Sequence, residues 1–535
     1  MTLSSRILVF LAVLYVAFAV RYRIIGSDGT AWREIINNDG KGYYQHLRGL
    51  LVEGAVPEPW MLSLSGEGSA IKFFCGTAVL QAPFVLAAHA WTLFFSAGPE
   101  DGYSIHYQLA VLESALISFL IGLHFTRKLL LRQGFCERST GVTILLLSLG
   151  TGLPIYAIWH PGMSHIHSFM VVAAAIYAFT IAIGSDRNRP WIAFGVLAGL
   201  MILLRPLNAI LLLCLPFFIP TGNPHIERRK LLISIGSAVL VSCIQPVIWY
   251  LQSGSFLGDP YSDEGFHFLR PALLLTWSSA RNGLFFYWPV LLLIFPGLLL
   301  LSRKDQRRVW PLAITFFLFA YISSSWWNWS YGTSFGQRNY VDLTSLLAIP
   351  IAAVVSAAIK RKWTWLLFPI VALNLFQCWQ YVHGLIDPGE FTARKYVYSF
   401  LNTDPFKAAS IGGRHDLPPY APRGIFTVVD TVFQEEIVIE VPPAGHGGGE
   451  WFLSLEATSF QSMPFVPSMV SITGSSSAIP SNGIHFQLEH VPMTGEKPWP
   501  NEIRLRALNT GDRMHVSIRP ADRIRNVRLR LMAPR

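Results

Sequence analysis

The sequence predicts a polytopic α-helical membrane protein with a C-terminal β-sandwich domain. Of its 535 residues, 52% are hydrophobic and only 14% are charged, whereas a soluble chain carries about 25% charged residues. Apolar runs long enough to cross a bilayer recur through the first part of the chain. The last part has short runs of alternating apolar and polar residues between turn residues, as antiparallel strands do. This composition excludes an ordinary soluble enzyme, a disordered chain and a fibrous repeat.

About eleven apolar runs are candidate transmembrane helices, since a spanning helix needs about 20 predominantly apolar residues. They are residues 6–21, 107–125, 140–159, 168–183, 190–204, 206–220, 231–251, 284–301, 309–323, 343–359 and 363–382. Basic clusters between the runs set their direction, because cytoplasmic loops carry an excess of Lys and Arg. The clusters lie at residues 127–138, 187–189, 228–230, 303–308 and 360–362. All five become cytoplasmic if residues 190–220 form two short spans that are broken at Arg205-Pro206.

Two apolar segments need a separate interpretation. Residues 73–95 are long enough to span, but counting them would place the 127–138 cluster outside. We therefore expect a re-entrant or interfacial helix in the outer leaflet there. The first run, with Arg6 at its start and Ala17-Phe18-Ala19 near its end, also resembles a signal peptide. We favour an uncleaved first span, because its removal would leave the helix bundle without its first member.

The chain divides into three predicted parts. Residues 1–383 form the transmembrane domain, 384–424 a connector rich in Pro, Gly and charges, and 425–535 the sandwich. With the basic clusters inside, the N-terminus is cytoplasmic and the sandwich is extracytoplasmic. Eight short runs are the expected strands of the sandwich. They are residues 426–429, 437–441, 451–455, 469–473, 485–488, 503–508, 514–518 and 527–532.

The net charge of +10 does not indicate nucleic-acid binding. Residues 385–535 hold 15 basic and 15 acidic side chains, so the whole excess lies among the apolar runs. That distribution is typical of a membrane protein. The five cysteines lie in or beside apolar runs and show no CxxC spacing, which excludes a disulfide framework or a zinc ribbon.

Polar residues gather in the long loops that this topology places outside, at residues 22–72, 160–167, 252–283 and 324–342. Polar groups held at a membrane surface by a helix bundle are a default functional site. In the first loop, Asp39 precedes a segment with helical spacing. A carboxylate there could act as a general base or bind a metal. The alternative is a purely structural role as a helix N-cap. Lys72 closes this loop and suits a phosphate, although a lipid headgroup would fit equally well.

The second loop and the predicted break hold further candidates. His160, His165 and His167 could bind a metal, but no acidic or thiol ligand stands nearby in the sequence. We therefore expect hydrogen bonds to a polar substrate and no metal cofactor. Arg205, three residues before Asn208, needs an anionic partner if it is buried. The candidates are a protein carboxylate and a ligand phosphate.

The two remaining outer loops place arginines and aromatic residues at the ends of spans. Arg281 and Arg338 each lie among small residues, where they bind either lipid headgroups or a ligand. Trp327 belongs to an aromatic group, Trp326-Trp327-Asn328-Trp329 with Tyr331. An ordinary aromatic belt is the favoured reading of that group, and stacking on a sugar or prenyl group is the alternative.

Together these residues resemble the GT-C class of membrane glycosyltransferases, which use polyprenyl-phosphate sugars. The class includes protein O-mannosyltransferases and the bacterial transferases that add aminoarabinose to lipid A. The resemblance covers about residues 6–382 and is closest to a bacterial branch. Four segments carry it: D-G-x-G-Y-Y at 39–44, G-T-A-x-L-x-x-P-F at 76–84, S-H-x-x-S-F at 164–169 and W-x-x-G-x-S-F-G-Q-R at 329–338.

The resemblance implies roles for individual residues. Asp39 would be the catalytic base, and the donor phosphate would be held by Lys72, Arg205, Arg281 and Arg338. Residues expected to bind substrate are Tyr43, Tyr44, His160, His165, His167, Asn208, Trp327 and Gln337. The chain departs from several class members in having Asn38 where a second acid would stand, and histidines in place of an acid in the second outer loop. Both departures weaken a metal-dependent mechanism and an oligosaccharyltransferase function.

We therefore expect a bacterial inner-membrane enzyme that works on the periplasmic side. It would transfer a sugar from a polyprenyl-phosphate donor to a glycan, lipid or protein acceptor, with inversion at the anomeric carbon. Two alternatives stay open, a transporter or flippase of lipid-linked saccharides and a polymerase or ligase of them. A transporter or flippase predicts two repeated halves with charges deep in the bundle. A polymerase or ligase predicts neither the early D-G-x-G-Y-Y loop nor the appended sandwich.

Overall fold

The computed structural model describes most of the helical part and the strands of the C-terminal part. The described residues are 1–26, 29–54, 71–220, 226–257, 264–386, 391–403, 425–433, 435–441, 451–460, 469–474, 484–487, 501–505, 511–519 and 524–534. Contacts divide the chain into two compact units. One comprises Met1–Ile24 with Trp32–Cys378, and the other Ile25–Ala31 with Trp379–Arg535. The boundary expected at residue 383 stays a prediction.

The first unit is helical. Its α-helices are α1 (Leu3–Ala19), α2 (Asp39–Arg48), α3 (Gly76–Phe95), α4 (Ile105–Arg132), α5 (Glu137–Gly150), α6 (Ser164–Ala182), α7 (Asn188–Leu204), α8 (Arg228–Ser242), α9 (Ile244–Ser253), α10 (Leu273–Ser278), α11 (Leu284–Tyr287), α12 (Ile294–Ser302), α13 (Gln306–Ser324), α14 (Thr344–Lys360) and most of α15 (Phe368–Val382). Shorter 3₁₀ and π segments join them at η1 (Val20–Ile25), η2 (Ala31–Glu34), η3 (Gly49–Glu53), η5 (Ile155–Trp159), η6 (Pro206–Phe218), η7 (Pro289–Leu293), η8 (Arg338–Val341) and η9 (Thr364–Leu367). A further helix, α16 (Ala393–Ser399), lies in the second unit.

Within the described part of the chain, six helices have the length and composition to cross a membrane. They are Leu3–Ile25, Gly76–Phe95, Ile105–Arg132, Ser164–Ala182, Arg228–Ser253 and Thr364–Val382. Several shorter apolar helices accompany them, and every predicted spanning run overlaps a helical segment. The chain is thus a multi-pass membrane protein, while the expected count of about eleven spans stays a prediction.

Residues 76–95 form one continuous helix, α3, with Pro83 inside it. The segment is thus helical, and a re-entrant position for it stays a prediction. The helix is long and apolar enough to span. An interfacial position for it stays a prediction.

The predicted break at Arg205-Pro206 is confirmed. Helix α7 ends at Leu204, Arg205 is extended with φ −156° and ψ 119°, and Pro206 begins the 3₁₀ helix η6. Proline disfavours the helical conformation in the residue before it, which explains the extended arginine. Because a 3₁₀ helix rises about 2.0 Å per residue, the 13 residues of η6 reach about 26 Å, close to the thickness of a bilayer core.

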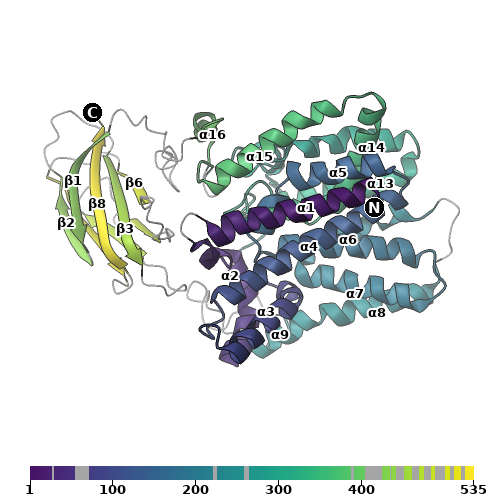
Figure 1. Cartoon of the computed structure of the whole chain (residues 1–535), viewed down its shortest axis with the longest axis horizontal. Helices are drawn as coiled ribbons and strands as arrows, with labels where there is room; N and C mark the ends of the chain where they lie inside the picture. The colour runs from purple at the N-terminus through teal and green to yellow at the C-terminus, as the bar shows by residue number, and fades with distance from the viewer. Residues whose placement is uncertain are drawn as a thin grey trace. The chain divides into compact units, whose positions relative to one another are not determined.

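Side-chain contacts bring the basic clusters of three loops to one end of the bundle. The contacts are Arg127 Nη2 to Thr2 Oγ1 (2.9 Å), Arg132 Nη2 to the Thr180 carbonyl (2.7 Å) and Lys230 Nζ to Asp186 Oδ1 (3.5 Å). Figure 1 shows α1, α4, α6, α7 and α8 alongside one another, with the N-terminus at one end and α2 at the other. The loop that holds Asp39 therefore lies at the end opposite these clusters.

Glycines let neighbouring helices approach closely. A Cβ at Gly195 or Gly199 of α7 would lie within 2.5 Å of a backbone oxygen of α8. Small residues at such contacts allow backbones to pack tightly in a membrane, where no hydrophobic force drives helices together.

The second unit contains the strands β1 (Ile425–Phe433), β2 (Glu436–Glu440), β3 (Trp451–Phe460), β4 (Met469–Gly474), β5 (Ile484–Gln487), β6 (Asn501–Leu505), β7 (Arg513–Arg519) and β8 (Ile524–Pro534). Each expected run overlaps one of these strands. They form two four-stranded antiparallel sheets, in the orders β1-β8-β3-β6 and β2-β7-β4-β5. Met514, Val516 and Ile518 are buried at alternate positions of β7, as the alternating pattern predicts. The face-to-face packing of a sandwich stays a prediction.

Candidate functional site

Asp39 is the first residue of α2 and forms an ion pair with Arg338. The distance from Asp39 Oδ2 to Arg338 Nη2 is 2.8 Å, and the two side chains are 34% and 16% exposed. The N-cap of α2 is Asn38, and no side chain caps the helix. Asp39 is therefore not the N-cap, and its carboxylate points to a cation from the 324–342 loop.

The first and second outer loops pack directly on each other beside this pair. A Cβ on Gly40 would lie 3.0 Å from the Gly162 Cα, so the two backbones touch. The Ser164 hydroxyl donates to the Tyr43 hydroxyl (3.1 Å). These contacts position Asp39 next to the loop that holds His160 and His165.

The backbone of the site is strained at several points. Asn38, Asn282 and Tyr331 have φ values of 45°, 58° and 58°. Non-glycine residues seldom adopt this region, and such strain clusters at functional sites. Asn38 directly precedes Asp39, and Asn282 donates from Nδ2 to the carbonyls of Ser330 and Gly332, on either side of Tyr331 (3.0 and 2.9 Å).

Lys72 reaches the same region from the end of the first loop. Its Nζ lies 2.9 Å from Glu264 Oε1. The next residue, Phe73, covers Gly42 so closely that a Cβ there would clash with the ring. Phe73 also packs edge-on against Tyr43, with ring centroids 4.9 Å apart. Through its neighbour Phe73, Lys72 is held against Gly42 and Tyr43, the part of α2 that directly follows Asp39.

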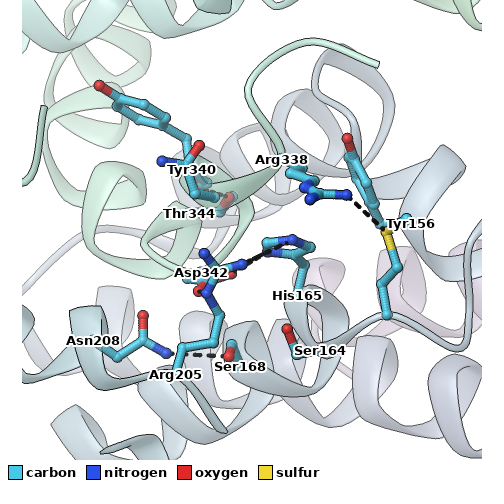
Figure 2. A network of polar contacts seen from close by, with 12 residues as sticks. Tyr156, Ser164, His165, Ser168, Arg205, Asn208, Arg338, Tyr340, Asp342 and Thr344 are labelled. Atoms are coloured by element: carbon cyan, nitrogen blue, oxygen red, sulfur yellow. Dashed lines mark hydrogen bonds and ion pairs between the residues drawn. The ribbon is translucent and has the colours of Figure 1, made fainter. Parts of the chain in front are cut away.

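A second carboxylate, Asp342, lies between Arg205 and His165. Asp342 Oδ1 is 2.9 Å from His165 Nδ1, and Asp342 Oδ2 is 3.4 Å from Arg205 Nε. Figure 2 shows these three side chains converging, with Asn208 and Ser168 beside them. Asn208 Nδ2 donates to Ser168 Oγ at 3.1 Å. The anionic partner that a buried Arg205 requires is thus a protein carboxylate.

The electrostatics link the two carboxylate sites. Burial raises the pKa of Tyr43, while Arg205 and Arg338 lower it, so both cations act on one side chain of α2. Burial also raises the pKa of Asp342 to about 7, against the opposing effect of Arg205. Burial lowers the pKa of His160 to about 3, which keeps that imidazole neutral at physiological pH.

Other predicted residues border this cluster. Gln337 is buried, and its Nε2 donates to the carbonyls of Asn282 (2.9 Å) and Trp329 (3.3 Å). It therefore ties the loop of Arg281 to the loop of Arg338. The Nε of Arg281 is buried and has no hydrogen-bond partner among the described residues. Trp327 is 46% exposed, consistent with an aromatic belt.

Two predicted substrate-binding residues contact the protein interior instead. The Tyr44 hydroxyl donates to the Gly102 carbonyl at 2.7 Å. His167 lies between Ser118 Oγ (2.9 Å) and Gln81 Nε2 (3.5 Å), so it links α6 to α4 and α3. Substrate contact by either residue stays a prediction.

Asp342 and Glu264 were not among the residues predicted from the sequence. Asp342 directly precedes a predicted span and lies four residues after Arg338. A carboxylate at the outer end of a span is a suitable counter-ion for a buried Arg205, and this position could have indicated Asp342 as its partner. Glu264 lies in an outer loop without any pattern that pairs it with Lys72.

The arrangement is suited to an anionic substrate. Arg338, Arg205 and Lys72 each contact a carboxylate. The partners of Arg338 and Lys72 are partly exposed, so an incoming phosphate can replace them. The described residues contain no group of three His, Cys, Asp or Glu side chains that could hold a metal ion.

Residues 108–250 match the model of a family described as dolichyl-phosphate-mannose-protein mannosyltransferase. The resemblance to the GT-C class is confirmed by this match. The matched segment includes the histidines and Arg205, whereas Asp39, Lys72, Arg338 and Asp342 lie outside it. No curated protein sequence matches the chain.

Three solved structures of GT-C proteins are similar to the chain at low identity. ArnT from Cupriavidus metallidurans, bound to undecaprenyl phosphate, has 17% identity over 74% of this chain and 68% of its own, with a TM-score of 0.43. Oligosaccharyltransferase AglB from Archaeoglobus fulgidus, in complex with an inhibitory peptide and a dolichol-phosphate, has 13% identity over 74% and 54%, with a TM-score of 0.40. Arabinosyltransferase EmbB from Mycobacterium smegmatis has 10% identity over 98% and 64%, with a TM-score of 0.38. The chain thus spans less than two thirds of AglB and of EmbB.

Proposed function

We propose that this protein is a membrane glycosyltransferase that moves a sugar from a polyprenyl-phosphate donor to an acceptor outside the cytoplasm. The donor class is supported by the family described for residues 108–250 and by the cations of the site. The acceptor is a glycan, a lipid or a protein. The active site would lie on the periplasmic side of a bacterial inner membrane, opposite the basic clusters.

The observation that carries the proposal is the 2.8 Å ion pair between Asp39 and Arg338. It brings together a carboxylate that reaches solvent and a cation from a distant loop. The carboxylate can accept the proton of an acceptor hydroxyl. The cation can bind the phosphate of the donor.

In the proposed reaction, an acceptor oxygen attacks the anomeric carbon in line with the phosphate. The bond from the sugar to the phosphate oxygen breaks, and the electron pair leaves with the prenyl phosphate. Asp39 takes the acceptor proton, and the cations neutralise the developing phosphate charge. A single displacement of this kind inverts the anomeric configuration.

Donor binding and base activation are coupled in this scheme. While Arg338 is paired with Asp39, the carboxylate is engaged in a charge-assisted hydrogen bond and is a poor proton acceptor. A donor phosphate that takes over Arg338 releases the carboxylate. The enzyme would then remove a proton only when a donor is in place.

The proposal gives further roles to other predicted residues. In the proposal, Arg205, Lys72 and Arg281 are further phosphate ligands, and Tyr43 and His160 line the sugar pocket, whereas His165 contacts Arg205 and Asp342. The C-terminal strands would position the acceptor. This last role is separate from the chemistry and does not affect the test below.

The test replaces Asp39 by Asn in the full-length protein in detergent. Asp39→Asn keeps the size of the side chain and removes its basicity, so transfer from a prenyl-phosphate sugar should fall by about 10²–10⁴. Donor binding should be kept, because Arg338 remains. The control is Glu53→Gln, which removes a carboxylate from the same loop that pairs with Arg48. Near-normal turnover of Asp39→Asn would refute the base assignment, and a loss in Glu53→Gln alone would move it to that residue.

A further inference from the structure

We infer that Asp342 is a positioning residue that orients Arg205 toward the phosphate of the donor. The inference rests on the proposed function and adds to it a residue with a distinct role. Asp342 would act only through Arg205 and would not touch the substrate.

Burial decreases in order from the carboxylate to the cation. The side chain of Asp342 is 1% exposed, that of His165 is 3% exposed and that of Arg205 is 17% exposed. The carboxylate and the imidazole therefore lie behind the guanidinium. Of the three side chains, only that of Arg205 keeps a substantial exposed fraction.

Two sides of the guanidinium are held. Asp342 Oδ2 lies 3.4 Å from Nε, and the ring of His165 lies 2.9 Å from Nη1. Three elements of the chain meet here, because Arg205 stands at the break after α7, His165 at the start of α6 and Asp342 just before α14. A long side chain with such contacts loses its rotamer freedom before a ligand arrives, which lowers the entropic cost of binding.

Asp342 is unsuited to be the base itself. A general base must reach the acceptor proton within hydrogen-bonding distance, and a 1% exposed carboxylate with two protein partners does not offer such access. Asp39, at 34% exposure, does. The two carboxylates therefore divide the roles of positioning and proton transfer.

The charge state of this group gives a second readout. The charged and titratable groups around Asp342 are His165 from α6, Arg205 from the break, Arg338 from η8 and Tyr331 from the loop before it. Burial raises the pKa of Asp342 to about 7, so the carboxylate is anionic above that pH and becomes neutral below it. A sugar phosphodiester keeps its charge across this range. Donor affinity should therefore fall as the pH drops from 8 to 6.

The experiment measures binding of farnesyl-phosphoryl-mannose, a phosphodiester probe, to the full-length protein in detergent. Asp342→Asn should weaken binding about tenfold to a hundredfold, the range of one charge-assisted contact, and should abolish the pH dependence. The double variant with Arg205→Gln should bind no more weakly than Arg205→Gln alone, since residues that act as one unit are not additive. Glu137→Gln is the matched control, because it breaks the 3.1 Å pair with Arg127 at the opposite end of the bundle.

The outcomes separate this inference from the proposed function. The positioning role would be overturned if Asp342→Asn bound the probe as tightly as the parent or more tightly. It would also be overturned if the affinity losses of the two single variants multiplied in the double variant. Either result would leave the glycosyltransferase proposal intact. If Asp342→Asn fails to fold, the pH profile of the unmodified protein decides, and a flat profile between pH 6 and 8 overturns the inference. If the unmodified protein binds neither this probe nor undecaprenyl phosphate, the proposed function fails and the inference fails with it.

Discussion

Replacing Arg338 by Gln separates the two tasks of the Asp39–Arg338 pair. The substitution keeps a polar side chain of moderate length and removes the positive charge. The geometry of the pair, 2.8 Å with Arg338 16% exposed, is that of a charge-assisted hydrogen bond. A phosphate that replaces Asp39 at the same guanidinium should gain about 1.5–3 kcal/mol. Donor affinity should therefore fall about tenfold to a hundredfold in Arg338→Gln.

The same substitution should cost little stability. Asp39 is 34% exposed, so water solvates the carboxylate once its partner is lost. Ion pairs that water can reach contribute about 1 kcal/mol or less. A folded, monodisperse variant with a thermal midpoint near that of the parent is expected, which allows its binding data to be interpreted.

The assay is a titration with a prenyl-phosphate sugar, followed by steady-state transfer with donor and acceptor varied separately. The KM for the donor should rise and the KM for the acceptor should stay unchanged. Arg48→Gln is the matched control, because Arg48 lies in the same helix as Asp39 and pairs with a carboxylate, Glu53, that has no role in the proposal. Donor affinity unchanged within twofold in Arg338→Gln would refute the phosphate role of this arginine.

Two further predictions test the surroundings of the site and its side of the membrane. Gly40→Ala places a Cβ 3.0 Å from the Gly162 backbone and should lower turnover about tenfold or more by displacing Asp39. In the control Gly236→Ala, the new Cβ meets nothing within 4 Å, so turnover should not change. Equal activities of the two variants would contradict the loop contact. A reporter that is active only outside the cytoplasm should be active when fused after Arg535 and inactive when fused after Arg229, whereas the opposite pattern would place the site on the cytoplasmic side.

The helices of this protein were predictable from the sequence because their signal is local. An apolar run of sufficient length between basic clusters is readable at each position. The break at Arg205 was predictable for the same reason, since Pro206 restricts the residue before it. The alternating runs that became strands β1 to β8 likewise needed no knowledge of the rest of the chain.

The tertiary structure decided which of the polar residues act together. Arg338 could equally have bound lipid headgroups, and only the approach of the 324–342 loop to α2 pairs it with Asp39. Asp342 and Glu264 became visible only as partners of Arg205 and Lys72, and His167 turned out to link helices. The physical reason is that a side chain shows its type in the sequence, whereas its partner is set by the packing of segments far apart in the chain. Composition and local pattern were sufficient to predict the membrane class and the candidate residues. The packing of the outer loops set which carboxylate faces which cation.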